Sequence, residues 1–239
     1  MNLEGKRIVV VGGSSGMGLA TARDLAAAGA KVTIASRSAE KLERAARAIG
    51  NPVERYVLDI RKEDEIVAFF EAVKTLDHLV VSASGAVLGP FLEIETRTAQ
   101  DFFDSKFWGT YRVARHGAPR LAKNGSITFF SGAASQRGTP GLSAGSAINA
   151  AIEALGRTLA VELAPIRVNT VAPGLIETPV WDDLMAEQDK KAFFKEAAAK
   201  LPARRIGTPE DIAHSVRYLI ENTYTTGSVL FPEGGYLQV

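Results

Sequence analysis

The sequence lacks cysteine altogether, which excludes disulfide bonds and thiolate chemistry. Histidine is scarce, and the three copies, His78, His116 and His214, stand in no metal-ligand spacing, so we expect no metal site. An excess of one charge is also missing, because 28 basic and 27 acidic residues leave a formal net charge of +1. The basic residues are scattered, which disfavours a nucleic-acid partner.

Long hydrophobic runs are absent too, since none reaches the roughly 18 residues that a membrane-spanning helix needs. Residues 1–7 lead directly into the first apolar segment, and we therefore expect neither a signal peptide nor a membrane partner. A cytoplasmic protein is the default interpretation. With 239 residues, 46% of them hydrophobic, the chain suits one large α/β domain or two small ones.

The most informative stretch is a predicted strand, turn and helix near the N-terminus. The apolar run Arg7–Val11 is typical of a short strand buried on both faces. It leads into Gly12-x-x-x-Gly16-x-Gly18, and an alanine-rich helix follows that ends at Gly29. Glycine at such a turn lets the backbone approach a pyrophosphate, and the free N–H groups at the helix start bind the anion. The unit predicts dinucleotide binding, although such turns also occur for purely structural reasons.

The end of the second predicted strand, Lys31–Ser36, indicates which dinucleotide is bound. A carboxylate there binds the ribose 2′-hydroxyl of NAD, whereas a basic residue accommodates the 2′-phosphate of NADP. Ser36, Arg37 and Ser38 stand at this position, and the first carboxylate follows only at Glu40. We therefore favour NADP over NAD. The alternative is that Arg37 is a solvated residue after a strand.

Strands and helices alternate along the whole chain, which predicts a doubly wound parallel sheet with helices on both faces. Further strands are expected at 53–58, 77–83, 125–130, 165–172 and 228–231, and further helices at 39–49, 62–76, 98–121, 142–163 and 208–220. One irregular insertion, residues 179–202, carries Trp181, Phe193 and Phe194 among many charges. It is either a lid over a site or a surface helix pair that buries its aromatic residues locally.

Several motifs in order make the whole chain resemble the short-chain dehydrogenase/reductase family, which implies a single Rossmann-like domain over residues 1–239. The glycine turn at 12–18 matches the family's cofactor turn in spacing, although Val11 stands where the family usually has threonine. Residues 82–85 keep only the small character and the final glycine of the family's Asn-Asn-Ala-Gly. Four further segments match family motifs: the adenine-holding pair (59–60), the stretch before the nicotinamide turn (161–169), that Pro-Gly turn (172–178) and a C-terminal signature (233–235).

This resemblance implies an oxidoreductase that binds NADP and a small-molecule substrate, assembled as a homodimer or homotetramer. Carried over position by position, it also implies a set of cofactor-binding residues. These are Gly12, Ser14, Ser15, Gly16, Met17, Gly18, Ser36, Arg37, Ser38, Asp59, Ile60, Ala83, Ser84, Gly85, Asn149, Pro173, Gly174, Ile176 and Thr178.

The family's catalytic residues are missing at the matching positions. The family works with asparagine, serine, tyrosine and lysine: the tyrosine moves the proton, the lysine binds the nicotinamide ribose and lowers the tyrosine pKa, and the serine holds the substrate oxygen. Aligned without a gap, the serine, tyrosine and lysine positions hold Gly132, Gly145 and Asn149. The asparagine position holds Lys106. No tyrosine precedes a lysine by four residues, and Tyr111 matches a packing aromatic of the family.

Lysine and asparagine have thus exchanged places, and we expect the Lys106 ammonium to reach Asn149 inside the site. Burial there can lower the pKa of lysine, which can then polarise a carbonyl, orient a water or act as a weak acid. The alternative is a solvent-facing Lys106, since lysine is rarely buried. Gly132 and Gly145 leave space for a bulkier substrate or for water. The candidate catalytic residues are Lys106, Asn149, Ser131 and Ser143, and Ser146 is a further nearby hydroxyl.

Three functions remain open. The first is an NADP(H)-dependent oxidoreductase with an altered proton path, acting on a small carbonyl, quinone or imine-like substrate. A positioned acid contributes ~10²–10⁴-fold, and a substrate whose product anion is stable needs it least. The second is a cofactor-binding sensor or assembly subunit without turnover, which the missing tyrosine favours. The third is a lyase or isomerase without net redox chemistry. The aromatic insertion at 179–202 favours the first and third functions over the second.

Overall fold

One parallel sheet organises the molecule. In the computed structural model, which describes residues 2–83 and 85–239, seven strands stand in the order β3-β2-β1-β4-β5-β6-β7. Every neighbouring pair is parallel. The strands are β1 Arg7–Val11, β2 Lys31–Ser36, β3 Val53–Val57, β4 Leu76–Val81, β5 Leu121–Phe130, β6 Arg167–Val171 and β7 Val229–Leu230. The order reverses between β1 and β4, where ligands bind in open α/β sheets.

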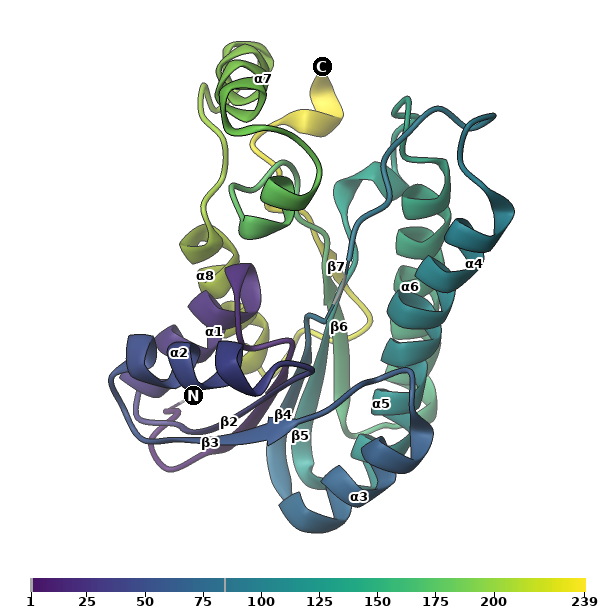
Figure 1. Ribbon diagram of the computed structural model, residues 1–239. Coiled ribbons are helices and arrows are strands. Elements are labelled where there is room, and N and C mark those ends of the chain that lie inside the picture. The colour runs from purple at the N-terminus through teal and green to yellow at the C-terminus, as the bar shows by residue number, and fades with distance from the viewer. Residues whose placement is uncertain (1, 84) are drawn as a thin grey trace.

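Helices cover both faces of this sheet (Figure 1). They are α1 Gly16–Ala27, α2 Ala39–Ile49, α3 Glu63–Val73, α4 Thr96–Phe103, α5 Gly109–Gly117, α6 Ser143–Glu162, α7 Glu187–Lys200 and α8 Pro209–Glu221. Helices α1, α2 and α8 lie on one face, and α3, α5 and α6 lie on the other. The predicted doubly wound, Rossmann-like α/β fold is confirmed.

The residues of β1 explain why the first strand lies at the centre of the sheet. Their side chains alternate, so that Ile8 and Val10 pack under α1, α2 and α8, and Val9 and Val11 pack under α3, α5 and α6. All four are at most 1% exposed. Burying an aliphatic side chain of this size contributes ~1.5–3 kcal/mol, so an unbroken apolar strand is most stable between two helical layers.

Two of the predicted helices have other boundaries in the structure. The helix expected over 98–121 begins at Thr96, widens into a π-helical turn at Asp104–Trp108, and gives way to a short 3₁₀ turn before β5 begins at Leu121. Pro119 lies in that 3₁₀ turn and has no N–H with which to continue a helix. The helix expected over 62–76 ends at Val73, because Lys74 adopts a φ of 62°.

The insertion at 179–202 forms a 3₁₀ turn, Pro179–Asp183, followed by α7. The Trp181 ring lies 5.5 Å from that of Phe193 and 5.7 Å from that of Phe194, measured between centroids. None of the α7 side chains is buried, and Figure 1 shows α7 standing above α8 at one end of the molecule. The aromatic residues therefore pack on one another, and the lid role stays a prediction.

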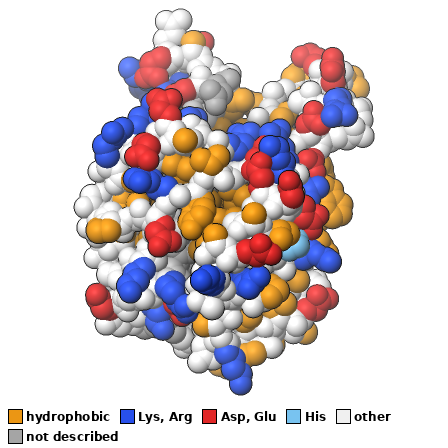
Figure 2. Space-filling view, turned by 60° about the horizontal axis from the view of Figure 1, so that its bottom comes forward, with side chains coloured by type: hydrophobic (Ala, Val, Ile, Leu, Met, Phe, Trp, Pro, Cys, Tyr) orange, Lys and Arg blue, Asp and Glu red, His pale blue; other side chains and the backbone are white. Residues whose placement is uncertain are grey.

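Basic and acidic side chains are interspersed on the face shown in Figure 2. Among the residues that the structure describes, no helix is both long enough and apolar enough to span a bilayer.

Candidate functional site

The turn after β1 lies against the end of β4, at the point where the strand order reverses. Gly12 has a φ of +90°, and a Cβ built on it would lie 2.4 Å from the backbone nitrogen of Ala83. A Cβ on Gly18 would lie 2.2 Å from the carbonyl oxygen of Gly12. Both glycines are therefore required by the close approach of backbone to backbone that forms this turn.

The start of α1 is suited to an anion. Ser15 precedes the helix and is exposed, and its hydroxyl makes no capping hydrogen bond within the described residues. The first turn of α1 holds no acidic side chain. A Cβ on Gly16 would lie 3.4 Å from Thr178, so the turn after β6 meets the helix start here. The N–H groups and positive dipole end of α1 thus lie beside the predicted nicotinamide turn.

The predicted adenosine end surrounds the carboxyl ends of β2 and β3. The Ser36 hydroxyl is buried and has no hydrogen-bond partner in the described part of the chain, which fits a ligand that would complete it. Ser38 accepts a hydrogen bond from the backbone of Lys41 at 3.2 Å and so caps α2. An Arg61 hydrogen bond is the largest cause that lowers the pKa of Asp59 to about 2, and Arg37 adds to it.

Two further predicted cofactor residues, Ile60 and Ile176, are buried and pack inside the protein. Ile60 is 7% exposed, and a Cβ on Gly109 would lie 2.5 Å from its side chain, so glycine there lets α5 approach. Ile176 is 6% exposed and pairs with Gly207 in an isolated bridge. Ser84 lies outside the described residues.

The turn after β6 is held from both sides. The carbonyl of Pro173 accepts a hydrogen bond from the backbone of Ala133 at 2.8 Å, which ties this turn to the end of β5. A Cβ on Gly174 would lie 2.7 Å from the backbone of Glu233, so glycine is needed for contact with the C-terminal segment.

Lys106 lies inside the molecule and contacts Asn149. It is the one buried residue of the π-helical turn, with 8% of its surface exposed. Its Nζ donates a hydrogen bond to Asn149 Oδ1 at 2.7 Å. The expected contact between Lys106 and Asn149 is therefore confirmed.

No carboxylate among the described residues forms an ion pair with Lys106. Burial alone therefore lowers the pKa of this lysine to about 8. The Nζ atom also lies 5.9 Å from the centroid of the Phe102 ring, whose face attracts a cation. Single π-helical turns and side chains with perturbed pKa values are each frequent at functional sites.

Gly132 and Gly145, at the positions predicted for the family's serine and tyrosine, differ in their surroundings. A Cβ on Gly132 would lie 2.8 Å from Asn149 Nδ2, so a serine there would displace the amide. A Cβ on Gly145 would make only ordinary contacts at 3.9 Å with Leu142 and Phe102. Glycine at 132 is thus coupled to asparagine at 149, whereas position 145 has room for a side chain.

A buried carboxylate that sequence reasoning missed lies one helical turn beyond Asn149. Glu153 is 1% exposed and accepts hydrogen bonds from Ser131 at 3.0 Å, Ser135 at 2.5 Å and Gln136 at 2.9 Å. Ser131 is therefore turned toward Glu153. The signal available in the sequence was an acidic residue in a helix of small and apolar residues, four positions after Asn149.

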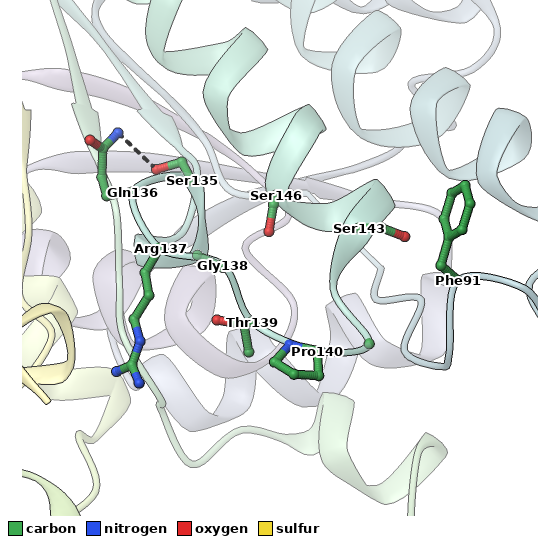
Figure 3. Close-up of a pocket in the computed structure, with 11 residues that line it drawn as sticks. Phe91, Ser135, Gln136, Arg137, Gly138, Thr139, Pro140, Ser143 and Ser146 are labelled. Atoms are coloured by element: carbon green, nitrogen blue, oxygen red, sulfur yellow. Dashed lines mark hydrogen bonds between the residues drawn. The ribbon is translucent and has the colours of Figure 1, made fainter.

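A cavity of about 520 Å³ opens beside the start of α6 (Figure 3). Its lining residues are Phe91, Ala134, Ser135, Gln136, Arg137, Gly138, Thr139, Pro140, Gly141, Ser143 and Ser146. Ser143 thus lies in the wall, whereas Lys106 and Asn149 do not line this cavity. Tyr111 packs 5.6 Å from the Trp108 ring, between centroids. No group of three or more potential metal ligands occurs in the described residues.

A parallel sheet with a glycine turn at its switch point defines a Rossmann-like nucleotide-binding protein. Residues 11–237 match the family described as enoyl-(acyl carrier protein) reductase. The chain is 32% identical to 3-oxoacyl-[acyl-carrier-protein] reductase FabG of Thermotoga maritima, over 98% of this chain and 99% of the relative. It belongs to the short-chain dehydrogenase/reductase family.

Solved structures of short-chain dehydrogenases and oxidoreductases have the same fold as this chain. A small-chain dehydrogenase in complex with NADPH has a TM-score of 0.87 and 37% identity, over 99% of this chain and 100% of that one. An NADPH-bound short-chain oxidoreductase from Pseudomonas aeruginosa, described as containing an atypical catalytic center, has a TM-score of 0.90 and 29% identity. The match covers 97% of this chain and 96% of that one.

Proposed function

We propose that the protein is a cytoplasmic NADP(H)-dependent oxidoreductase in which Gly145 and Asn149 replace the family's catalytic tyrosine and lysine, and in which Lys106 gives an altered proton path. Its substrate is a small carbonyl, quinone or imine-like compound. The observation that carries this proposal is the buried Lys106 Nζ, 2.7 Å from Asn149 Oδ1, with a pKa of about 8. The Pseudomonas aeruginosa relative is likewise an NADPH-bound protein with an atypical catalytic center.

The chain's own residues fit NADP(H). The glycine turn at 12–18 and the start of α1 would hold the pyrophosphate, and residues 36–38 with residues 59–60 would hold the adenosine end. The orphaned Ser36 hydroxyl and the nearby Arg37 suit the 2′-phosphate. Residues 83–85 and 173–178 would hold the nicotinamide end. Bound NADPH supplies a hydride to the substrate.

Lys106 would supply the proton or its electrostatic equivalent. At pH 7 a lysine whose pKa is about 8 is still mostly an ammonium, and its pKa is close enough to neutrality for proton transfer. Asn149 Oδ1 accepts one of the three N–H bonds, which orients the group and leaves the others for a substrate oxygen. Because the phenol that usually donates the proton is missing from this proposed site, the substrates we expect are those whose product anion is already stable.

A second candidate is a nucleotide sensor or assembly subunit without turnover. One observation favours it: Lys106 and Asn149 are only 8% and 7% exposed and do not line the cavity beside α6. Under either function, the homodimer or homotetramer of the family is the expected assembly, which light scattering on the purified chain measures.

Fluorescence titration with NADPH, followed by NADPH oxidation against quinones, conjugated enones and unactivated ketones, tests the proposal. We expect tight NADPH binding and turnover of quinones and enones in preference to ketones. Lys106→Met should lower kcat about 10²-fold or more while NADPH affinity stays unchanged. The matched control is Lys123→Met, which replaces an exposed lysine of β5.

The two candidates give different results. The sensor or assembly subunit would be favoured if the chain binds NADPH, no compound oxidises the bound NADPH, and Lys106→Met leaves NADPH affinity unchanged. Turnover that survives intact in Lys106→Met would remove lysine from the proton path but leave the oxidoreductase.

A further inference from the structure

Glu153 on α6 is a buried charge that the proposed proton path does not use. It is 1% exposed and forms no ion pair with any basic residue among those described. The three hydrogen bonds that its side chain accepts come from neutral donors, and all three donors belong to the short segment 131–136 after β5. Burying a carboxylate is costly unless its oxygens accept hydrogen bonds, so Glu153 and this segment hold each other in place.

Both carboxylate oxygens of Glu153 take part in this contact. The hydroxyls of Ser131 and Ser135 donate to Oε1 at 3.0 and 2.5 Å, and the Gln136 amide donates to Oε2 at 2.9 Å. Gln136 also donates to the Ser135 hydroxyl at 3.2 Å, which links two of the donors to each other (Figure 3). Hydrogen bonds to a charged acceptor are stronger than those between neutral groups, so the segment is fixed at both of its ends.

The backbone of the same segment holds the turn after β6. The N–H of Ser131 donates to the carbonyl of Val171 at 2.9 Å, and the N–H of Ala133 donates to the carbonyl of Pro173 at 2.8 Å. Pro173 belongs to the predicted nicotinamide turn. Through one short segment, Glu153 therefore connects α6 to that turn.

Gly132 lies between the anchored residues and packs against Asn149. Its backbone is extended, and a Cβ built on it would lie 2.8 Å from Asn149 Nδ2 and 3.4 Å from Asn149 Cγ. This contact occupies the Nδ2 end of the amide and leaves Oδ1 to accept the hydrogen bond from Lys106 Nζ at 2.7 Å. An amide rotated by half a turn would present two N–H donors to the ammonium instead, so the contact at Gly132 decides how well Lys106 is oriented.

We propose that Glu153 is a positioning residue, which holds segment 131–136 on α6 so that Gly132 fixes the Asn149 amide with Oδ1 toward Lys106. The carboxylate acts through Asn149 and exchanges no proton itself. Its effect on turnover rests on the proposed function, whereas its effect on the contact between Lys106 and Asn149 requires no turnover.

An NMR titration of the full chain with ¹³C-labelled lysine measures the pKa of Lys106, whose signal is the one that Lys106→Met removes. An ammonium that loses its hydrogen-bond acceptor is less stable, so Glu153→Gln and Asn149→Leu should each lower this pKa by about 1. The double variant should show the same pKa as Asn149→Leu alone, because both changes remove the same contact. The matched control is Glu162→Gln, which replaces an exposed glutamate of the same helix and should leave the pKa unchanged.

An unchanged pKa of Lys106 in Glu153→Gln would overturn the proposal. A fall that persists in full on top of Asn149→Leu would overturn it too, because the carboxylate would then act on the ammonium by its charge and not through Asn149. Ser135→Ala keeps that charge and removes one anchoring hydroxyl, so a smaller fall in the pKa of Lys106 is expected. No change in Ser135→Ala would contradict the positioning role even where Glu153→Gln does not fold.

Turnover gives a second and separate measurement. Glu153→Gln should lower kcat for quinone reduction about tenfold in the native chain and leave it unchanged in Lys106→Met. A chain whose Lys106 responds to Glu153→Gln but never oxidises NADPH keeps the positioning role and loses the oxidoreductase. A chain that oxidises NADPH while Lys106 does not respond loses the positioning role only.

Discussion

Replacing Lys106 by methionine should remove a pH dependence of stability that the native chain shows above pH 8. Burial lowers the pKa of this lysine from 10.5 to about 8 in the folded chain. Below pH 8 both states hold the proton, and the folded state bears the full cost of burying the charge. Between about pH 8 and 10.5 the unfolded state holds more protons than the folded state, so the free energy of unfolding rises with pH.

The lowered pKa corresponds to a rise of roughly 3 kcal/mol across this range. At pH 7 alone the variant is uninformative, because two effects oppose each other. Removal of the buried ammonium stabilises the fold by a similar ~3 kcal/mol, and loss of the donor to Asn149 Oδ1 costs ~1–3 kcal/mol. The change with pH isolates the lysine, since the orphaned amide does not titrate.

Urea unfolding of the native chain, Lys106→Met and Lys123→Met at pH 7 and pH 10 measures this difference. The native chain and Lys123→Met should gain ~2–3 kcal/mol relative to Lys106→Met as the pH rises, because all other titrating groups are shared. Equal pH dependence in the native chain and in Lys106→Met would refute a buried lysine with a lowered pKa.

Three further substitutions test the surroundings of the site. Gly12→Ala should lower the free energy of unfolding by about 3 kcal/mol in urea melts and should weaken NADPH binding. The reason is that residue 12 has a φ of +90° and that a Cβ there would lie 2.4 Å from the Ala83 nitrogen. Unchanged stability would contradict that geometry. Arg37→Asp should reduce the ratio of NADPH to NADH affinity at least ~10-fold in fluorescence titrations, and a constant ratio would place the 2′-phosphate elsewhere. Glu153→Gln should cost ~1–3 kcal/mol of stability by chemical denaturation, since an amide cannot accept all three hydrogen bonds, and a neutral result would show that the network relaxes freely.

The parts of the fold that were predictable from the sequence are those that local patterns encode. The apolar run of β1 predicts a strand that is buried on both faces. The glycines that follow it predict a turn in which the backbone makes a close approach. The contact between Lys106 and Asn149 was predictable only by resemblance, from the positions that we assigned to these two residues in the family's pattern.

The features that were missed depend on partners far along the chain. The π-helical turn at Lys106 precedes Gly109, whose contact with Ile60 brings two distant segments together. No local periodicity reports such a contact, and the single helix expected over 98–121 followed from periodicity alone.

The same reason explains the missed polar groups. Glu153 receives its donors from residues 17 to 22 positions earlier, and Tyr236 contacts residues 97 and 99 positions away. In the sequence, Glu153 is one acidic residue in a helix and Arg137 one basic residue in a loop. Only the folded chain shows that the first is buried and that the second is held by Tyr236 of the C-terminal segment.

Every function considered for this chain requires that the turn at Gly12 and the start of α1 bind a nicotinamide dinucleotide. Isothermal titration of the purified chain with NADPH and with NADH measures this binding. We expect one site per chain, tighter for NADPH, and weakened in Gly12→Ala. Absence of heat or saturation with either dinucleotide would contradict it, and would leave this chain with the architecture of its family but not the chemistry.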